Sequence, residues 1–342
     1  MAERLKLGII GAGRIGKIHI DNIARFIPQA KFEGLADIML SPEQEAWARG
    51  LGARIVSKDP GDLLKDPEIR AVAVCSSTGA HADLTIAAAR AGKHIFCEKP
   101  IDLTVGKVRV ALDAVKKAGV KLQIGFNRRF DHNFARIREY ARAGELGEIH
   151  LVRITSRDPA PPSIDYVKVS GGLFMDMMIH DFDMARFQAG SEIVEVYAAG
   201  AVLVDPAIGE AGEVDTAVVT LRFANGAFGV IDNSRKAAYG YDQRVEVFGS
   251  RGSARAENDK PNTALLLTEK GETAEKPLYF FLERYKQAFV DEMAGFADAV
   301  LNDRPVAVSG EDGLATMYAA LAALTSLKEK RPVSIEEIKA RL

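Results

Sequence analysis

The sequence lacks most of the features that mark secreted, membrane-spanning or nucleic-acid-binding proteins. Its two cysteines, Cys75 and Cys97, are too few for a disulfide framework. The 45 basic residues nearly balance the 47 acidic ones, and the formal net charge of −2 excludes a broadly basic nucleic-acid binder. No stretch approaches the roughly 20 consecutive apolar residues that cross a bilayer. We therefore expect neither nucleic acid nor membrane among its partners.

The first residues also lack the pattern of a signal peptide. Met1–Lys6 leads directly into a short apolar run, without the longer apolar stretch and the small-residue cleavage site that secretion requires. We therefore expect a cytoplasmic protein.

The chain has enough length and apolar material for two folded domains. It has 342 residues, of which 47% are hydrophobic and 27% charged, as is typical of globular proteins. Up to about residue 125, short apolar runs such as Leu5–Ile10, Ala71–Cys75 and His94–Cys97 alternate with helical patterns. This alternation predicts an α/β fold with a doubly wound parallel sheet over residues 1–125.

Beyond residue 125, longer and more alternating strands are predicted, for example Glu148–Arg157 and Asp215–Phe223. Asn225-Gly226 is a strong hairpin signal between two of them. Helical patterns return at Phe280–Leu301 and Glu311–Leu327. Residues 126–342 are therefore expected to form an α+β domain with an open, mostly antiparallel sheet, whose C-terminal helices could pack on the first domain.

A Gly-x-Gly-x-x-Gly pattern follows the first strand and opens the first helix. Gly11 permits the tight turn, Gly13 lets the backbone approach a pyrophosphate, and Gly16 allows close helix–strand packing. Asp37, about 20 residues further on, can accept hydrogen bonds from ribose hydroxyls and would repel a 2′-phosphate. The sequence therefore predicts an NAD-binding Rossmann domain, with a glycine turn in a nucleotide-free fold as the alternative.

Two further features indicate catalysis. The strand His94–Cys97 ends in Glu98-Lys99-Pro100, and ligands of parallel sheets bind beyond the carboxyl ends of the strands, where Lys99 lies. Asp176 and His180 are four residues apart in an apolar run, so in a helix they would share one face. A histidine beside a carboxylate can transfer protons near neutral pH. A capped core histidine is the alternative.

These residues suit NAD-dependent oxidation of an alcohol. His180 could accept the hydroxyl proton while Asp176 orients its ring, and Lys99 would stabilise the developing alkoxide. Which of Lys99 and His180 is the immediate base stays open. We expect no metal, because none of the six histidines forms H-x-x-x-H and the two cysteines are far apart.

Together, Gly11–Gly16, Glu98-Lys99-Pro100 and the Asp176…His180 segment resemble the glucose–fructose oxidoreductase/inositol dehydrogenase/rhizopine-catabolism family, over essentially the whole chain. The stretches Gly125–Asp131, Ser156–Pro162 and Tyr239–Asp242 are most similar to its inositol branch. The resemblance implies a Rossmann domain, then a sheet domain that carries the substrate pocket and a homo-oligomer contact, in a tetramer or dimer. It also implies oxidation of the cyclic polyol myo-inositol to scyllo-inosose.

The resemblance also implies roles for individual residues. Lys99, Asp176 and His180 would form the catalytic triad, and substrate contacts would come from these three and from Arg129, Asp158, Asp183 and Tyr241. The expected cofactor contacts are Gly11, Gly13, Arg14, Ile15, Gly16, Asp37, Ser76, Ser77, Thr78, His81, Glu98 and Lys99. Many family members have a Thr-Pro pair where this chain has Ser77-Thr78-Gly79, although the hydroxyls here can still line the cofactor.

Two other functions fit the same sequence. One is a scyllo-inositol or sugar dehydrogenase with the same machinery. The other is a non-catalytic NAD-binding sensor or regulator, which would not need Lys99, Asp176 and His180 together.

Overall fold

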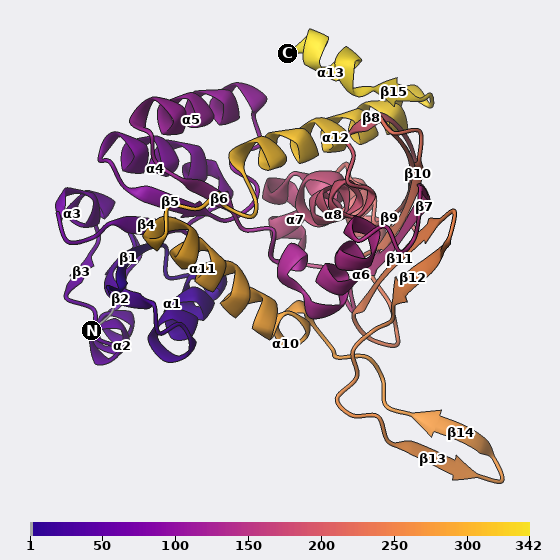
Figure 1. The fold of residues 1–342 in the computed structure, drawn as a ribbon, viewed down its shortest axis with the longest axis horizontal. Helices are drawn as coiled ribbons and strands as arrows, with labels where there is room; N and C mark the ends of the chain where they lie inside the picture. Colours follow the sequence, from indigo (N-terminus) through magenta and orange to yellow (C-terminus); the bar gives the residue numbers. More distant parts are fainter. Residues whose placement is uncertain (1–2) are drawn as a thin grey trace. The chain divides into compact units, whose positions relative to one another are not determined.

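The computed structural model describes residues 3–342. It consists of two compact units, one formed by Met1–Phe130 and Gln287–Ala315, the other by Asp131–Lys286 and Thr316–Leu342. Each unit is built on its own sheet (Figure 1). None of the described helices is long and apolar enough to cross a membrane.

The sheet of the first unit is parallel throughout and has the order β3-β2-β1-β4-β5-β6. Its strands are β1 (Leu5–Ile10), β2 (Ala30–Ala36), β3 (Ile55–Ser57), β4 (Ala71–Val74), β5 (His94–Cys97) and β6 (Leu122–Ile124). The order reverses between β1 and β4, and this reversal is the point where ligands of doubly wound sheets bind. The carboxyl ends of β1, β4 and β5 therefore define the expected cofactor edge.

Helices cover the first sheet and bury its apolar strands. They are α1 (Arg14–Phe26), α2 (Pro42–Gly50), α3 (Pro60–Lys65), α4 (Thr78–Arg90), α5 (Val105–Ala118) and α11 (Lys286–Leu301). Met293 and Phe296 of α11 join the same buried core as Leu7 of β1 and Ile20 of α1. The first unit therefore takes part of its core from a helix late in the sequence.

The sheet of the second unit is mixed and has the order β12-β11-β7-β10-β9-β8-β15. The strands are β7 (Ile149–Arg157), β8 (Ile193–Ala201), β9 (Thr216–Phe223), β10 (Phe228–Ser234), β11 (Asp242–Gly249), β12 (Gly252–Ala256) and β15 (Val333–Ser334). β7 and β10 pair in parallel, and the other neighbours pair antiparallel. With the parallel sheet of the first unit, this arrangement confirms the predicted α/β fold class.

The helices of the second unit include a π-helical segment. They are α6 (His132–Arg142), α7 (Ile164–Ser170), the π-helix η2 (Leu173–Met177), α8 (Ile179–Ala189), α9 (Pro206–Glu210), α10 (Phe281–Arg284), the larger part of α12 (Gly310–Glu329) and α13 (Ile335–Arg341). A short 3₁₀ helix, η1 (Asn127–Phe130), ends the first stretch of the first unit. π-Helical turns occur frequently at functional sites, which draws attention to η2.

Local sequence signals agree with most of these elements. The predicted Asn225-Gly226 hairpin between β9 and β10 is confirmed, with Gly226 at φ +88°. The single helix predicted over Phe280–Leu301 is wrong, because the chain leaves helical geometry at Tyr285 and forms α10 and α11 instead. The hairpin of β13 (Leu265–Thr268) and β14 (Gly271–Ala274), which projects from the second sheet in Figure 1, was not predicted.

Candidate active site

The glycine loop after β1 is packed tightly on its inner side and open on its outer side. Gly11 has φ +108°, and a Cβ there would lie 2.6 Å from the backbone of Cys75. A Cβ on Gly16 would lie 2.0 Å from the Gly11 carbonyl oxygen, whereas a Cβ on Gly13 would meet nothing within 4 Å. No side chain caps the N-terminus of α1. The loop therefore offers free backbone N–H groups beside open space, which fits a pyrophosphate.

Asp37 lies beside this loop, at the carboxyl end of β2. Its Oδ2 accepts a hydrogen bond from the Ala12 N–H at 2.5 Å, and its Oδ1 accepts one from the Met39 N–H at 2.7 Å. Each oxygen keeps lone-pair capacity for another donor. The carboxylate is thus fixed next to the phosphate loop and can still bind ribose hydroxyls. Arg14 and Gly13 are exposed and Ile15 is half-buried at the start of α1.

The segment after β4 contributes hydroxyl groups to the same edge. Ser76 and Thr78 are half-buried, Ser77 is exposed, and α4 begins at Thr78. His81 is buried, and its two ring nitrogens lie 2.8 Å from the Pro100 carbonyl oxygen and 2.9 Å from that of Ser76. His81 therefore connects the segment that follows β4 with the segment that follows β5. These contacts stabilise the loops at the expected cofactor edge.

Glu98 and Lys99 follow β5 directly. The Glu98 N–H donates to the Val74 carbonyl oxygen at 3.0 Å, which continues the sheet pairing by one residue. Both side chains are half-buried, and the Lys99–Pro100 peptide bond is cis. A Cβ on Gly125 would lie 2.9 Å from Glu98 Oε2, so the carboxylate packs against the backbone that follows β6. Lys99 thus stands at the carboxyl edge, as its position after β5 predicts.

Of the expected triad, Lys99 belongs to the first unit, and Asp176 and His180 belong to the second. Asp176 lies in the π-helix η2, and His180 lies in the first turn of α8. The expected helical stretch is therefore a π-helix followed by an α-helix, and the two meet at Met178. A π turn holds more residues than an α turn, so regular α-helical spacing does not describe how Asp176 is placed relative to His180.

Asp176 is held by two side chains of its own unit. The Tyr166 hydroxyl donates to Oδ1 at 2.9 Å, and Arg235 Nη2 donates to Oδ2 at 3.1 Å. The second guanidinium nitrogen, Arg235 Nη1, lies 3.3 Å from Asp158 Oδ2. The Arg235 side chain is only 6% exposed. Arg235 thus joins two residues that the sequence assigned to the substrate, Asp158 and Asp176.

The sequence interpretation missed Arg235. It follows β10, and the ion pairs join it to partners 59 and 77 residues away. No spacing pattern marks a single arginine with such distant partners. The sequence offers one signal for Arg235. It immediately follows a strand that ends in Asn233-Ser234, and ligands often bind at strand ends.

The remaining expected substrate residues lie in different surroundings. Asp183 is buried in α8. Tyr241 is buried, and its ring meets those of Phe280 and Tyr285 edge-on. Arg129 forms an ion pair with Asp312 at 3.0 Å and also donates to the Ala307 carbonyl oxygen. The Arg129 guanidinium therefore already has an acidic partner within the first unit.

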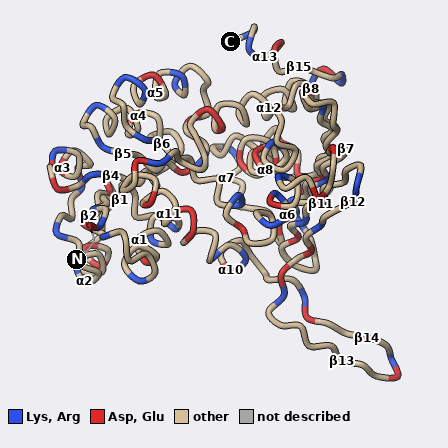
Figure 2. The backbone as a smooth tube through the Cα atoms, in the orientation of Figure 1, with Lys and Arg blue, Asp and Glu red and all other residues tan. Residues whose placement is uncertain are grey.

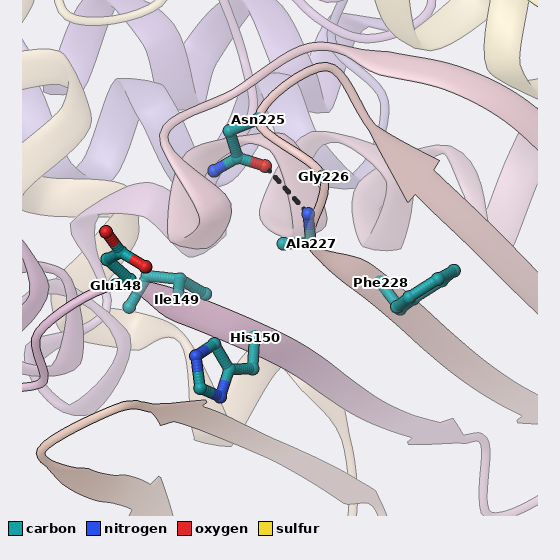
Figure 3. A pocket seen from close by; sticks show the side chains of 7 residues that line it. All are labelled: Glu148, Ile149, His150, Asn225, Gly226, Ala227 and Phe228. Carbon is teal, nitrogen blue, oxygen red and sulfur yellow. Dashed lines mark hydrogen bonds between the residues drawn. The ribbon is translucent and has the colours of Figure 1, made fainter.

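An open pocket of about 600 Å³ lies elsewhere on the second unit. It is lined by Glu148, Ile149, His150, Asn225, Gly226, Ala227 and Phe228 (Figure 3). None of the residues assigned to cofactor or substrate lines it, and Asn225 Oδ1 there caps its own turn by accepting from Ala227 N. We therefore do not assign the substrate to this pocket.

Two clusters among the described residues combine histidine with two carboxylates, although the sequence predicted no metal site. One is His19, Glu98 and Glu292 in the first unit. The other is Asp131, His132 and Asp259 in the second, where the guanidinium of Arg284 pairs with both aspartates. That guanidinium already supplies the positive charge at the second cluster. Acidic and basic residues are otherwise interspersed along both units (Figure 2).

Known proteins resemble both units. Residues 5–126 match the oxidoreductase family with an NAD-binding Rossmann fold, and residues 134–255 match the GFO/IDH/MocA C-terminal domain. The chain is 52% identical to the uncharacterized oxidoreductase YrbE of Bacillus subtilis, over 98% of each chain. It is 51% identical to the myo-inositol 2-dehydrogenase of Thermotoga maritima, over 98% of this chain and 99% of the relative.

A solved structure gives a similar picture. The scyllo-inositol dehydrogenase of Lactobacillus casei, with bound NAD(H) and scyllo-inositol, has a TM-score of 0.89 and 34% identity to this chain. The match covers 98% of this chain and 100% of that one. The expected NAD cofactor is confirmed by the Rossmann match. The chain therefore belongs to the GFO/IDH/MocA family and is an NAD-binding oxidoreductase.

Proposed function

We propose that this oxidoreductase converts myo-inositol into scyllo-inosose by oxidising the hydroxyl at C2. The observation that carries the proposal is the polar cluster of Asp158, Asp176, Tyr166 and Arg235 in the second unit. A cyclic polyol presents donors and acceptors around its whole ring, and such a cluster offers carboxylates, a hydroxyl and a guanidinium to match them. The similarity to a myo-inositol 2-dehydrogenase over nearly the whole chain supports the same substrate class.

In this proposal, Gly11, Gly13 and Gly16 hold the pyrophosphate of NAD, and Asp37 binds the adenosine ribose. Arg14, Ile15, Ser76, Ser77, Thr78 and Glu98 complete the cofactor site, with His81 supporting its loops. When bound, NAD accepts the hydride that leaves the carbinol carbon.

The remaining residues act on the substrate hydroxyl. Lys99 holds the oxygen and stabilises the negative charge that develops on it. His180 takes the hydroxyl proton, and Asp176, fixed by Tyr166 and Arg235, stabilises the imidazolium. Asp158, Asp183, Arg129 and Tyr241 bind the other hydroxyls. The C–H bond and the O–H bond thus break to give the ketone, a hydride on the cofactor and a proton on His180.

A panel of polyols tests the substrate assignment. NADH absorbance should rise with myo-inositol far faster than with linear sugars, and the product should be the 2-keto inositol. Turnover of scyllo-inositol alone would favour the second candidate function, a scyllo-inositol dehydrogenase. The similarity to the Lactobacillus casei enzyme supports that alternative. Absence of turnover on every polyol, with intact NAD binding, would indicate a sensor.

Replacement of His180 tests the proton acceptor. His180→Ala should lower kcat by roughly 10²–10⁴-fold because a positioned base contributes that much to proton transfer. NAD affinity should stay unchanged, since His180 is not one of the assigned cofactor contacts. An unchanged kcat would show that His180 is not the base.

We also propose that the chain forms a homo-oligomer through the outer face of the second sheet. The strand register places Tyr197, Thr220, Val230, Leu151 and Phe248 on one face, in neighbouring strands. Tyr197 and Phe248 are 40% and 45% exposed, which is unusual for aromatic side chains in regular strands. Light scattering should show a dimer or tetramer, and Phe248→Asp should reduce its size. A wild-type monomer would contradict this proposal.

A further inference from the structure

A buried polar cluster lies directly behind the cofactor edge of the first unit, and the proposed chemistry does not use it. His19 of α1, Glu98 after β5 and Glu292 of α11 place a ligand atom each within 4.8 Å of one another. His19 Nε2 lies 2.8 Å from Glu98 Oε1 and 4.0 Å from Glu292 Oε1. The side chains of His19 and Glu292 are fully buried, whereas that of Glu98 is 13% exposed.

Glu292 is held as a neutral acid by its surroundings. Neither of its carboxyl oxygens has a hydrogen-bond partner among the described residues. An ionised carboxylate without donors is very costly to bury, and a second carboxylate nearby adds repulsion. Burial first, and then the charge of Glu98, accordingly raise the pKa of Glu292 well above its usual range.

The His19 ring lies among aromatic side chains, with one nitrogen toward Glu98. Its ring packs edge-on against Phe96 and Phe289, at centroid distances of 5.0 and 5.9 Å. Its Nδ1 has no hydrogen-bond partner among the described residues, so a proton there would have no acceptor. The tautomer with a proton on Nε2 leaves only a lone pair unpaired and donates to Glu98.

Glu98 is therefore the member of the cluster that accepts the hydrogen bond from His19. Cys75 and Cys97 are neighbouring buried thiols, and burial is the main cause that raises their pKa values. Glu98 alone reaches the surface, and it lies at the carboxyl edge where NAD binds. The nicotinamide ring is positively charged in NAD⁺ and uncharged in NADH, so a carboxylate at this edge distinguishes the two.

We propose that His19 and Glu292 are positioning residues that hold the Glu98 side chain in place at the cofactor edge, and that Glu98 thereby strengthens binding of NAD⁺ relative to NADH. His19 supplies the hydrogen bond, and the neutral Glu292 leaves the His19 proton to Glu98. Gly125 sets the other side of the carboxylate, because a Cβ there would lie 2.9 Å from Glu98 Oε2. The proposal rests on NAD binding and is independent of which polyol is oxidised.

Dissociation constants of NAD⁺ and NADH, measured by calorimetry without substrate, test the positioning role. His19→Leu should weaken NAD⁺ binding about tenfold more than NADH binding, since a hydrogen bond to a charged group is lost. His19→Gln should restore most of the preference, because the amide can donate in place of Nε2. Gly125→Ala should reduce the preference by displacing the carboxylate while keeping its charge.

His94→Gln is the matched control, since His94 lies at the amino end of the same strand β5 and should leave both constants unchanged. Equal losses for NAD⁺ and NADH in His19→Leu and Gly125→Ala would overturn the proposal, as would an unchanged ratio in both. Because His19→Gln keeps a donor, it remains informative if His19→Leu does not fold.

Infrared spectroscopy tests the protonation state of Glu292 separately. The carbonyl band of a protonated carboxylic acid should be present in the wild type and absent from Glu292→Gln. Its absence from the wild type would overturn the assignment of a neutral Glu292. A stoichiometric metal ion that is lost in His19→Gln, measured by elemental analysis, would replace the proton-based explanation with a metal site.

Discussion

Glu292 in the first unit and the carboxylates that pair with Arg235 and Arg284 in the second unit lie in opposite surroundings. In the second unit, Asp176 and Asp158 share Arg235, and the buried Asp131 is paired with Arg284. In the first unit, Glu292 is fully buried, and among the described residues no arginine and no hydrogen-bond donor meets its carboxyl oxygens. The two arginine clusters of the second unit thus balance charge with charge, whereas burial favours the protonated form at Glu292.

This difference fits the ligand proposed for each unit. An uncharged polyol needs many fixed donors and acceptors, and ion pairs hold side chains in defined orientations. For a dinucleotide whose ring changes charge during the reaction, a neutral Glu292 adds no further negative charge behind the cofactor edge. The contrast predicts that substitution of Arg235 in the second unit acts by breaking ion pairs. In the first unit, substitution of Gly16 should act by steric overlap, and substitution of Glu292 by removing a protonated carboxyl group.

The largest effect is expected for Arg235→Met. Removing the guanidinium leaves Asp158 and Asp176 without their shared cation, and breaking a largely buried ion pair costs about 3–5 kcal/mol of unfolding free energy. Urea unfolding measures this loss. Activity should also fall, because Asp176 loses the hydrogen bond from Arg235.

The control for this change is Arg222→Met. Arg222 lies on β9 of the same sheet, and its exposed side chain approaches Glu195 only at 4.0 Å. Its replacement should alter stability by less than about 0.5 kcal/mol. Similar losses in the two variants would mean that Arg235 acts only as a general surface charge and would remove the contrast between the units.

The sequence predicted the parts of the site that are encoded locally. The glycine loop, Asp37 and Lys99 each belong to a strand end, and strand ends are recognisable from short apolar runs. Arg235 and Glu292 could not be predicted in this way, because their roles arise from partners such as Asp158 and Glu98 that are distant in sequence. The π-helical turn at Asp176 was also missed, since apolar periodicity does not distinguish it from an α-turn.

The next effect belongs to the first unit and compares two glycines in one loop. Gly16→Ala would place its Cβ 2.0 Å from the Gly11 carbonyl oxygen, and such overpacking costs about 1–3 kcal/mol. Gly13→Ala meets no atom within 4 Å, so its fold should be intact while NAD affinity falls. Thermal unfolding and NAD titration of both variants separate the two roles. Equal destabilisation of both variants would show that Gly13 is needed for folding.

A pH-dependent effect should follow from the neutral state of Glu292. Burial raises the pKa of this carboxyl group in the folded protein well above its usual range. The folded state therefore keeps a proton that the unfolded state loses, and the resulting stabilisation declines as pH rises above the unfolded value. Relative to Glu292→Gln, the wild type should lose thermal stability as pH rises above about 4.5, the usual carboxyl value. Parallel curves for the two proteins would contradict a protonated Glu292.

The smallest effect is expected at Glu337, a carboxylate of the second unit that is paired at the surface. Its hydrogen bond with Arg331 lowers the pKa of Glu337 to about 2. A lowered pKa stabilises the fold above the unfolded value of the carboxyl group, and this contribution is lost as pH falls toward about 2. Glu337→Gln should therefore lower Tm slightly at pH 7, with a difference that shrinks in acid and at high salt. If Glu337→Gln lost as much stability as Arg235→Met, burial would not distinguish strong ion pairs from weak ones in this unit.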